Sequence, residues 1–267
     1  MRRTPPAESS AYGSTGLPMT VLQAVLLVAG GVLAGITGAG AGIASLISYP
    51  ALLAVGLSPL VANVTNSVSL TLTTVGAMAG SRPELAGQGE RVRQFALLAI
   101  VGGVVGAVLL LTTPDQVFGY LVPWLIAGAS IALLLRPWLQ RRNANRMQAE
   151  HWPVTVGVAV GAVYSGYFGA GAGVLVLALL AAVIPDSLPR VNALKNTIVG
   201  TANMMAAIGF AAFGPVAWIY VLPLAAGCFL GGLVAPWIVR RIPETPLRIG
   251  IGLVGLGLAF KLGIDAY

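Results

Sequence analysis

Long apolar stretches follow one another along nearly the whole chain, separated by short polar segments. They span about residues 19–57, 60–80, 94–113, 116–135, 153–184, 191–214, 219–239 and 249–264. A helix that crosses a lipid bilayer needs about 20 mostly apolar residues, and most of these stretches reach that length. The pattern therefore predicts an all-α integral membrane protein.

The stretches form two sets of four that resemble each other in order and in detail. Each set opens with a long stretch that contains the pentapeptide GAGAG, at Gly38–Gly42 and again at Gly169–Gly173. Each set continues with a stretch rich in Asn, Ser and Thr, and aligning these stretches places Asn66 opposite Asn196 without a gap. Internal repeats of this kind are typical of secondary transporters.

We therefore expect four segments, which are a disordered tail at 1–18, a first membrane repeat at 19–136, a basic cytoplasmic loop at 137–152 and a second membrane repeat at 153–267. In the first repeat a basic connection follows the second stretch, whereas in the second repeat it follows the third. Arginine and lysine are concentrated in cytoplasmic loops. The two repeats are therefore expected to be inverted relative to each other.

The first stretch of each repeat is too long for a single membrane helix. Residues 19–57 would extend about 58 Å at 1.5 Å per residue, while the hydrocarbon core is only about 30 Å thick. Glycine weakens a helix and adopts left-handed backbone freely, so we expect the chain to break at GAGAG. Each cluster predicts either two half-helices or a helical hairpin near the bilayer centre.

The composition agrees with a lipid environment. Apolar residues make up 57% of the chain and charged residues only 9%, compared with about 25% charged residues in soluble domains. The formal net charge is +7. Because the basic residues fall in short clusters between apolar stretches, they indicate membrane-flanking loops and exclude a nucleic-acid-binding protein.

The GAGAG clusters also indicate an anion site. Irregular backbone inside a bilayer is tolerated only where it is buried in protein or lines a water-filled cavity. The N-terminus of a half-helix presents free N–H groups that favour an anion. We therefore predict substrate contacts from Gly38, Gly40, Gly42, Gly169, Gly171 and Gly173. The alternative is that these small residues only allow close helix packing.

Three polar side chains in the second stretches are candidates for the same site. Asn66 and Asn196 would be costly in contact with lipid, so they should face either a cavity or hydrogen-bond partners on other helices. Lys195 stands beside Asn196 in a stretch without any acidic residue. It either meets an anionic substrate or extends its ammonium group to the membrane surface.

Other chemistries lack the residues that they need. The single cysteine, Cys228, and the single histidine, His151, cannot assemble a metal cluster or a Ser-His-Asp triad. All eight acidic residues fall in tails, loops or the ends of stretches, whereas a cation pathway would want a buried acid. We expect no cofactor, no metal and no enzymatic activity.

The duplicated element resembles the TauE/SafE sulfite-exporter family of bacterial membrane transporters. In each copy GITGAGAG or YFGAGAG is followed by an apolar stretch, a short turn with proline (GLSPLVAN, PDSLPRVN) and a polar helix start. The resemblance covers the chain from about residue 20 onward. The family commonly has Gly-x-Gly-Gly-Gly at these clusters, whereas this chain has alanine between its glycines.

The resemblance implies a secondary transporter that moves a small, sulfur-containing anion, such as sulfite or an organosulfonate, across the bacterial inner membrane by alternating access. A proton or a sodium ion is the candidate coupling ion. An anion channel is the first alternative, and an integral-membrane enzyme is the second. The sequence leaves the direction of transport and the oligomeric state open.

Overall fold

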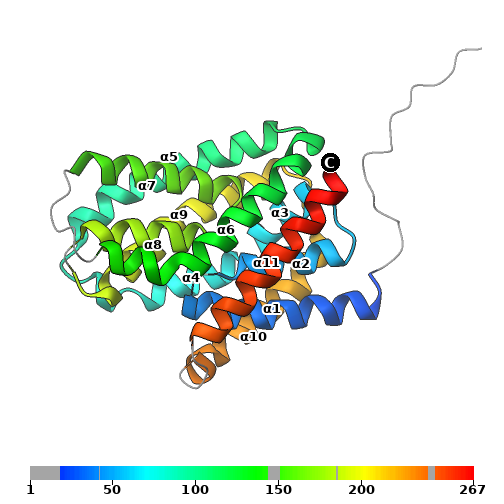
Figure 1. Cartoon of the computed structure of the whole chain (residues 1–267), viewed down its shortest axis with the longest axis horizontal. Helices are drawn as coiled ribbons and strands as arrows, with labels where there is room; N and C mark the ends of the chain where they lie inside the picture. The colour runs from blue at the N-terminus through cyan, green and yellow to red at the C-terminus, as the bar shows by residue number, and fades with distance from the viewer. Residues whose placement is uncertain (1–18, 42, 144–150, 185, 240–243) are drawn as a thin grey trace, which may run out of the picture.

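The structure is a computed structural model that describes residues 19–41, 43–143, 151–184, 186–239 and 244–267 (Figure 1). All regular secondary structure in these residues is helical. The tail at 1–18, Gly42 and part of the expected basic loop, at 144–150, lie outside the described residues.

The helices of the first half of the chain are α1 (Val21–Ala41), α2 (Ser45–Ala54), α3 (Pro59–Ser69), α4 (Thr71–Gly80), the short 3-10 helix η1 (Pro83–Leu85), α5 (Gly89–Thr112) and α6 (Asp115–Asn143). Those of the second half are α7 (His151–Tyr167), α8 (Ala172–Val183), α9 (Leu188–Phe213), α10 (Trp218–Val239) and α11 (Glu244–Ala266). Within the described residues, five helices are long and apolar enough to cross a membrane. Many of their large apolar side chains are exposed, as lipid-facing surfaces require.

Both glycine clusters turn helical hairpins. In the first hairpin, Gly30 of α1 lies against Ala51 of α2, and Gly38 lies against Ala44 near the turn. In the second hairpin, the contacts pair Gly157 with Leu179 and residues 161 with 176, so α7 and α8 are antiparallel as well. Of the two geometries that the sequence left open, the hairpin is the one that forms.

The two chain breaks do not fall at the same place in the repeated sequence. Helix α1 continues through Gly38 and Gly40 and ends at Ala41, whereas α7 ends at Tyr167, before its cluster begins. In the second copy the Tyr164 hydroxyl donates a hydrogen bond to the Ala170 carbonyl at 2.7 Å, across the turn. The matching residue in the first copy is Leu33, which has no hydroxyl group to close such a turn.

The second turn also needs glycine for conformational reasons. Gly169 and Gly171 have φ values of +77° and +74°, in the left-handed region that residues with a Cβ rarely adopt. Gly171 is the N-cap of α8. The second GAGAG cluster thus provides the two left-handed residues that start the returning helix.

The two halves are joined by pairs of parallel helices that pack through glycine. Helix α1 packs most extensively against α10, and α5 packs most extensively against α7. Gly31 of α1 lies against Gly227 of α10, and Gly35, four residues later in α1, lies against Gly232 of α10. The two helices therefore run in the same direction. Small residues allow this close approach of backbones.

The polar stretch of the first half is kinked, although the sequence predicts one continuous element at 60–80. Helices α3 and α4 are separated at Leu70. The hydroxyl groups of Ser67, Ser69 and Thr71 donate hydrogen bonds to carbonyl groups four residues earlier, at 3.0, 2.7 and 3.3 Å. Such back-bonding bends helices. The matching stretch of the second half forms the unbroken helix α9.

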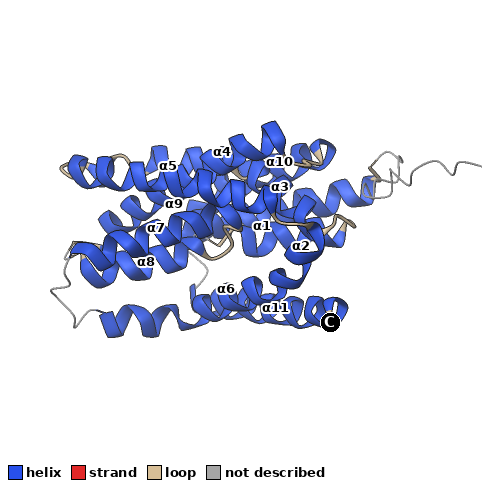
Figure 2. Cartoon of the chain, turned by 90° about the horizontal axis from the view of Figure 1, so that it is seen from above, coloured by secondary structure: helices blue, strands red, loops and turns tan. Residues whose placement is uncertain are grey.

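Helices α6 and α11 form an antiparallel pair, with Leu134 against Gly252 and Ser130 against Gly255. The pair lies as a layer along one side of the other helices (Figure 2). At the centre of the core, Phe168 at the end of α7 contacts the rings of Tyr49 and Phe118 at centroid distances of 5.5 and 6.2 Å. The residue that follows α7 is therefore anchored to both the first hairpin and α6.

The glycine contact between α1 and α10 can be tested with two neighbouring positions. A Cβ atom on Gly231 would lie 2.8 Å from the backbone of Val32, whereas a Cβ on Gly232 would meet no heavy atom within 4 Å. Because backbone atoms cannot rotate away, we expect Gly231→Ala to destabilise the fold by about 1–3 kcal/mol. The measurement is the melting temperature of the protein in detergent.

Gly232→Ala is the matched control, and it should leave the melting temperature unchanged or raise it, because alanine favours a helix over glycine by up to about 1 kcal/mol. Equal melting temperatures for the two variants would contradict the close approach of the helices.

Candidate functional site

A cavity of about 670 Å³ lies where the two hairpin turns meet α4, α9 and α10. The first hairpin contributes Gly38, Ala44 and Ser45, and the second contributes Phe168, Gly169 and Gly173. Ser45 is the first residue of α2, and Gly173 belongs to the first turn of α8. The N-termini of two helices from different halves of the chain therefore reach the same cavity.

Helix α9 contributes the most polar wall. Asn192, Lys195, Asn196 and Asn203 line the cavity because residues three or four positions apart lie on one face of a helix. The side chain of Lys195 is only 5% exposed. Lys195 therefore belongs to the cavity wall, near the start of α9, and is largely shielded from solvent.

Two hydrogen bonds tie this face of α9 to both halves of the chain. The Asn196 amide donates to the Ser81 hydroxyl at 2.9 Å, just beyond the end of α4. The Ser165 hydroxyl of α7 donates a hydrogen bond to the side-chain amide oxygen of Asn203 at 2.8 Å. Asn196 and Asn203 thus combine an interhelical hydrogen bond with a place on the cavity wall.

The opposite wall comes from the kinked polar helix of the first half. Its hydroxyl-bearing lining residues are Ser67, Thr71, Thr73 and Thr74. The Thr73 hydroxyl is buried without a hydrogen-bond partner in the described structure. A buried hydroxyl group without a partner is costly, so a bound ligand or water is expected beside it.

The structure brings together five of the nine residues that the sequence predicts for the site: Gly38, Gly169, Gly173, Lys195 and Asn196. Asn66 is buried in α3 and does not line this cavity. Gly171 faces Ala129 of α6 instead. Gly40 lies in the last turn of α1 and its surroundings are not described, and Gly42 lies outside the described residues.

Asn63 shows the alternative role for a buried asparagine, which is a hydrogen bond to another helix and not a contact with the cavity. Its amide group donates a hydrogen bond to the Tyr167 carbonyl at 2.9 Å. Tyr167 is the last residue of α7, where carbonyl groups lose their helical partners. An asparagine of the first half therefore satisfies the backbone at the turn of the second hairpin.

Sequence reasoning missed Glu84, which lines the cavity. One of its carboxylate oxygens, Oε2, is buried without a hydrogen-bond partner. Glu84 belongs to η1, a single 3-10 turn in the polar connection between α4 and α5, and η1 packs against α9. The apolar pattern carries no signal for this contact, because only the packing of η1 on α9 turns a loop acid towards the cavity.

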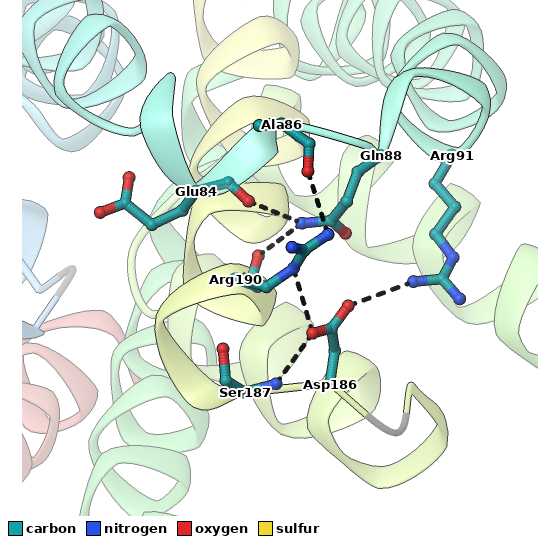
Figure 3. A network of polar contacts seen from close by, with 7 residues as sticks. All are labelled: Glu84, Ala86, Gln88, Arg91, Asp186, Ser187 and Arg190. Atoms are coloured by element: carbon teal, nitrogen blue, oxygen red, sulfur yellow. Dashed lines mark hydrogen bonds and ion pairs between the residues drawn. The ribbon is translucent and has the colours of Figure 1, made fainter.

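A polar network next to Glu84 clamps this loop of the first half to the start of α9 (Figure 3). Asp186 forms ion pairs with Arg190 at 3.1 Å and with Arg91 at 3.6 Å. Arg190 also donates to the Ala86 carbonyl at 3.1 Å, and the Gln88 amide donates to the carbonyl groups of both Glu84 and Arg190. The network lies where η1 and the start of α9 border the cavity.

Helices with exposed apolar faces surround a cavity that has polar walls, and two helix breaks lie at it. This arrangement is typical of multi-pass membrane transporters. The chain belongs to the sulfite exporter TauE/SafE family, whose sequence pattern matches residues 20–262. It is therefore a membrane transporter of this type and not an enzyme.

Two bacterial relatives are similar over most of their length. A protein named "Probable membrane transporter protein YfcA" from Escherichia coli (strain K12) is 26% identical over 237 residues, which cover 88% of this chain and 87% of that protein. A "Probable membrane transporter protein" from Haemophilus influenzae is 24% identical over 229 residues, which cover 84% of this chain and 88% of that protein. No solved structure matches the chain.

The clamp between the halves can be tested by removing its shared charge. In the described structure the Asp186 side chain is 23% exposed and faces two arginines, so we expect Asp186→Asn to lower the stability by about 1 kcal/mol. Thermal unfolding of the purified protein measures this effect.

The control is Glu90→Gln, because Glu90 pairs with Arg93 at 3.3 Å on the surface, where both side chains are more than 80% exposed. Such a pair contributes little, so this variant should melt like the wild type. A clamp without structural importance would give the same melting temperature for both variants.

Proposed function

We propose that the protein is a secondary transporter that moves a small anion, of the sulfur-containing kind, across the bacterial inner membrane by alternating access. The observation that carries the proposal is the buried ammonium group of Lys195 in a cavity that is also reached by two helix N-termini. The family name, sulfite exporter, supports sulfite or an organosulfonate as the substrate.

The balance of charges in the cavity favours an anion. Lys195 contributes one positive charge, and Glu84 contributes one negative charge when it is ionised. The N-termini of α2 and α8 each add roughly half a positive charge, and neither is offset by an acidic residue in the first helical turn. The hydrocarbon surroundings strengthen these interactions because they lower the effective dielectric constant.

The directions of the helices support an inverted repeat. Helices α5, α7 and α9 are parallel, since Gly102 and Gly106 of α5 lie against Ala162 and Gly166 of α7, and Gly103 and Ala107 of α5 lie against Ala202 and Gly209 of α9. The short connection at 214–217 then returns the chain into α10, which is parallel to α1. On this path α1 and α7, the opening helices of the two halves, cross the membrane in opposite directions, as alternating access by inverted repeats requires.

Arginines at the η1 end of the cavity support its orientation. Arg82 lies in the connection between α4 and α5, Arg91 and Arg93 lie near the start of α5, and Arg190 lies in the first turn of α9. The ion pairs of Asp186 bring Arg91 and Arg190 together. Positive residues favour the cytoplasmic side. The end of the cavity that is lined by Glu84 and Pro189 would then face the cytoplasm, with a proton or a sodium ion as the coupling ion.

The proposal is tested by counterflow in proteoliposomes. Vesicles are loaded with unlabelled sulfite, and the transient accumulation of labelled sulfite from outside is followed with time. A carrier exchanges the two pools and gives an overshoot, whereas an anion channel gives simple equilibration. Absence of an overshoot with sulfite and with short organosulfonates would contradict the proposal.

Lys195 gives the residue-level test of the anion site. Replacement by methionine keeps much of the side-chain volume but removes the charge, so a charge-assisted contact worth about 1.5–3 kcal/mol is lost. We expect Lys195→Met to weaken sulfite binding by roughly 10- to 100-fold, as measured by calorimetry.

Lys261→Met serves as the control, because Lys261 is an exposed lysine of α11 that does not line the cavity. This variant should bind sulfite like the wild type. If Lys195→Met is well folded and binds sulfite with unchanged affinity, Lys195 does not belong to the site.

A further inference from the structure

The cavity has an apolar wall that a small inorganic anion does not need. Leu72 of α4 and Phe229 and Leu233 of α10 line it. These side chains are also 62%, 54% and 63% exposed. Residues that both line a cavity and face outward lie at its opening, so the cavity opens between the neighbouring helices α4 and α10.

This opening lies at the depth of the bilayer. Phe229 is near the middle of the 22-residue helix α10, and Leu233 follows one turn later. A helix of this length spans the hydrocarbon core, about 30 Å thick, so its middle faces lipid chains. The exposed faces of Leu72, Phe229 and Leu233 are therefore in contact with an apolar medium.

Polar side chains line the same cavity, among them Lys195 and Asn196. Lys195 is buried, and Asn196 donates a hydrogen bond to the Ser81 hydroxyl. A volume of about 670 Å³ corresponds to roughly twenty water molecules at ~30 Å³ each. It falls within the range of about 300–1,000 Å³ that is typical of sites for organic ligands.

We propose that the substrate is an amphiphilic organic anion, with a charged head at Lys195 and an alkyl or aryl tail that rests on Leu72, Phe229 and Leu233 at the opening towards the lipid. This inference rests on the proposed function, because it names the substrate class of the same anion site. The head lies beside the buried Lys195, and the tail replaces lipid at the opening between α4 and α10.

The test uses sodium alkanesulfonates from methanesulfonate to octanesulfonate, titrated into the full-length protein in lipid nanodiscs. Each buried methylene group contributes about 0.8 kcal/mol, so binding should tighten about fourfold per carbon while the tail remains inside the cavity. Longer tails should give no further gain beyond partitioning into the lipid.

Partitioning into the bilayer also increases with tail length, so matched variants are needed. Leu233→Ala shortens a lining residue, and Leu230→Ala shortens a residue of the same helix that is 51% exposed and does not line the cavity. Octanesulfonate should bind Leu233→Ala at least about fourfold more weakly than Leu230→Ala, while methanesulfonate should bind both variants equally.

Each outcome is decisive. Equal loss or no loss of octanesulfonate affinity in the two leucine variants would overturn the tail site, and retained methanesulfonate binding that depends on Lys195 would leave the proposed anion transporter standing. If neither short nor long sulfonates bind to the wild type while sulfite does, the tail site is wrong and the proposed transporter stands. If sulfite fails to bind as well, the proposed function itself is wrong.

Discussion

The constraint on which the structure depends is that lipid offers no hydrogen bonds to a broken helix. Two hairpin turns interrupt the helices of this protein, and the second is satisfied from within the fold. The Tyr164 hydroxyl donates a hydrogen bond to the Ala170 carbonyl, and the Asn63 amide donates a hydrogen bond to the last carbonyl of α7. Residues of the same turn, Phe168 and Gly169, also line the cavity.

Helix α9 is the element through which the rest of the site is connected. It is hydrogen-bonded to the end of α4 through Asn196 and to α7 through Asn203. Its first turn is clamped to the loop after η1 by Arg190. Lys195 lies between these attachments, so its ammonium group is positioned by contacts to both halves of the chain. A movement of either half would therefore change the position of Lys195.

The sequence predicted the helical membrane class and the two chain breaks, because apolar pattern and glycine content report these features directly. It gave Lys195 and Asn196 as candidates for the site and left open whether they reach a cavity, another helix or the membrane surface, and in the structure both line the cavity. It could not predict that α1 continues into its GAGAG cluster as far as Ala41, while α7 ends at Tyr167, before the second cluster begins. A hydrogen bond from the Tyr164 hydroxyl closes the second turn, and the matching residue of the first copy, Leu33, has no hydroxyl group. It also could not place Glu84 or remove Asn66 from the cavity wall, because both depend on how η1 and α3 pack in three dimensions.

The pairing of α1 with α10 and of α5 with α7 has a consequence for how the molecule can move. The opening helix of each half packs against a helix of the other half, α1 against α10 and α7 against α5. Glycine contacts bring the backbones of each pair close together. In the proposed alternating-access cycle, the rigid bodies would therefore be mixed units that contain helices of both halves, instead of the two halves of the sequence.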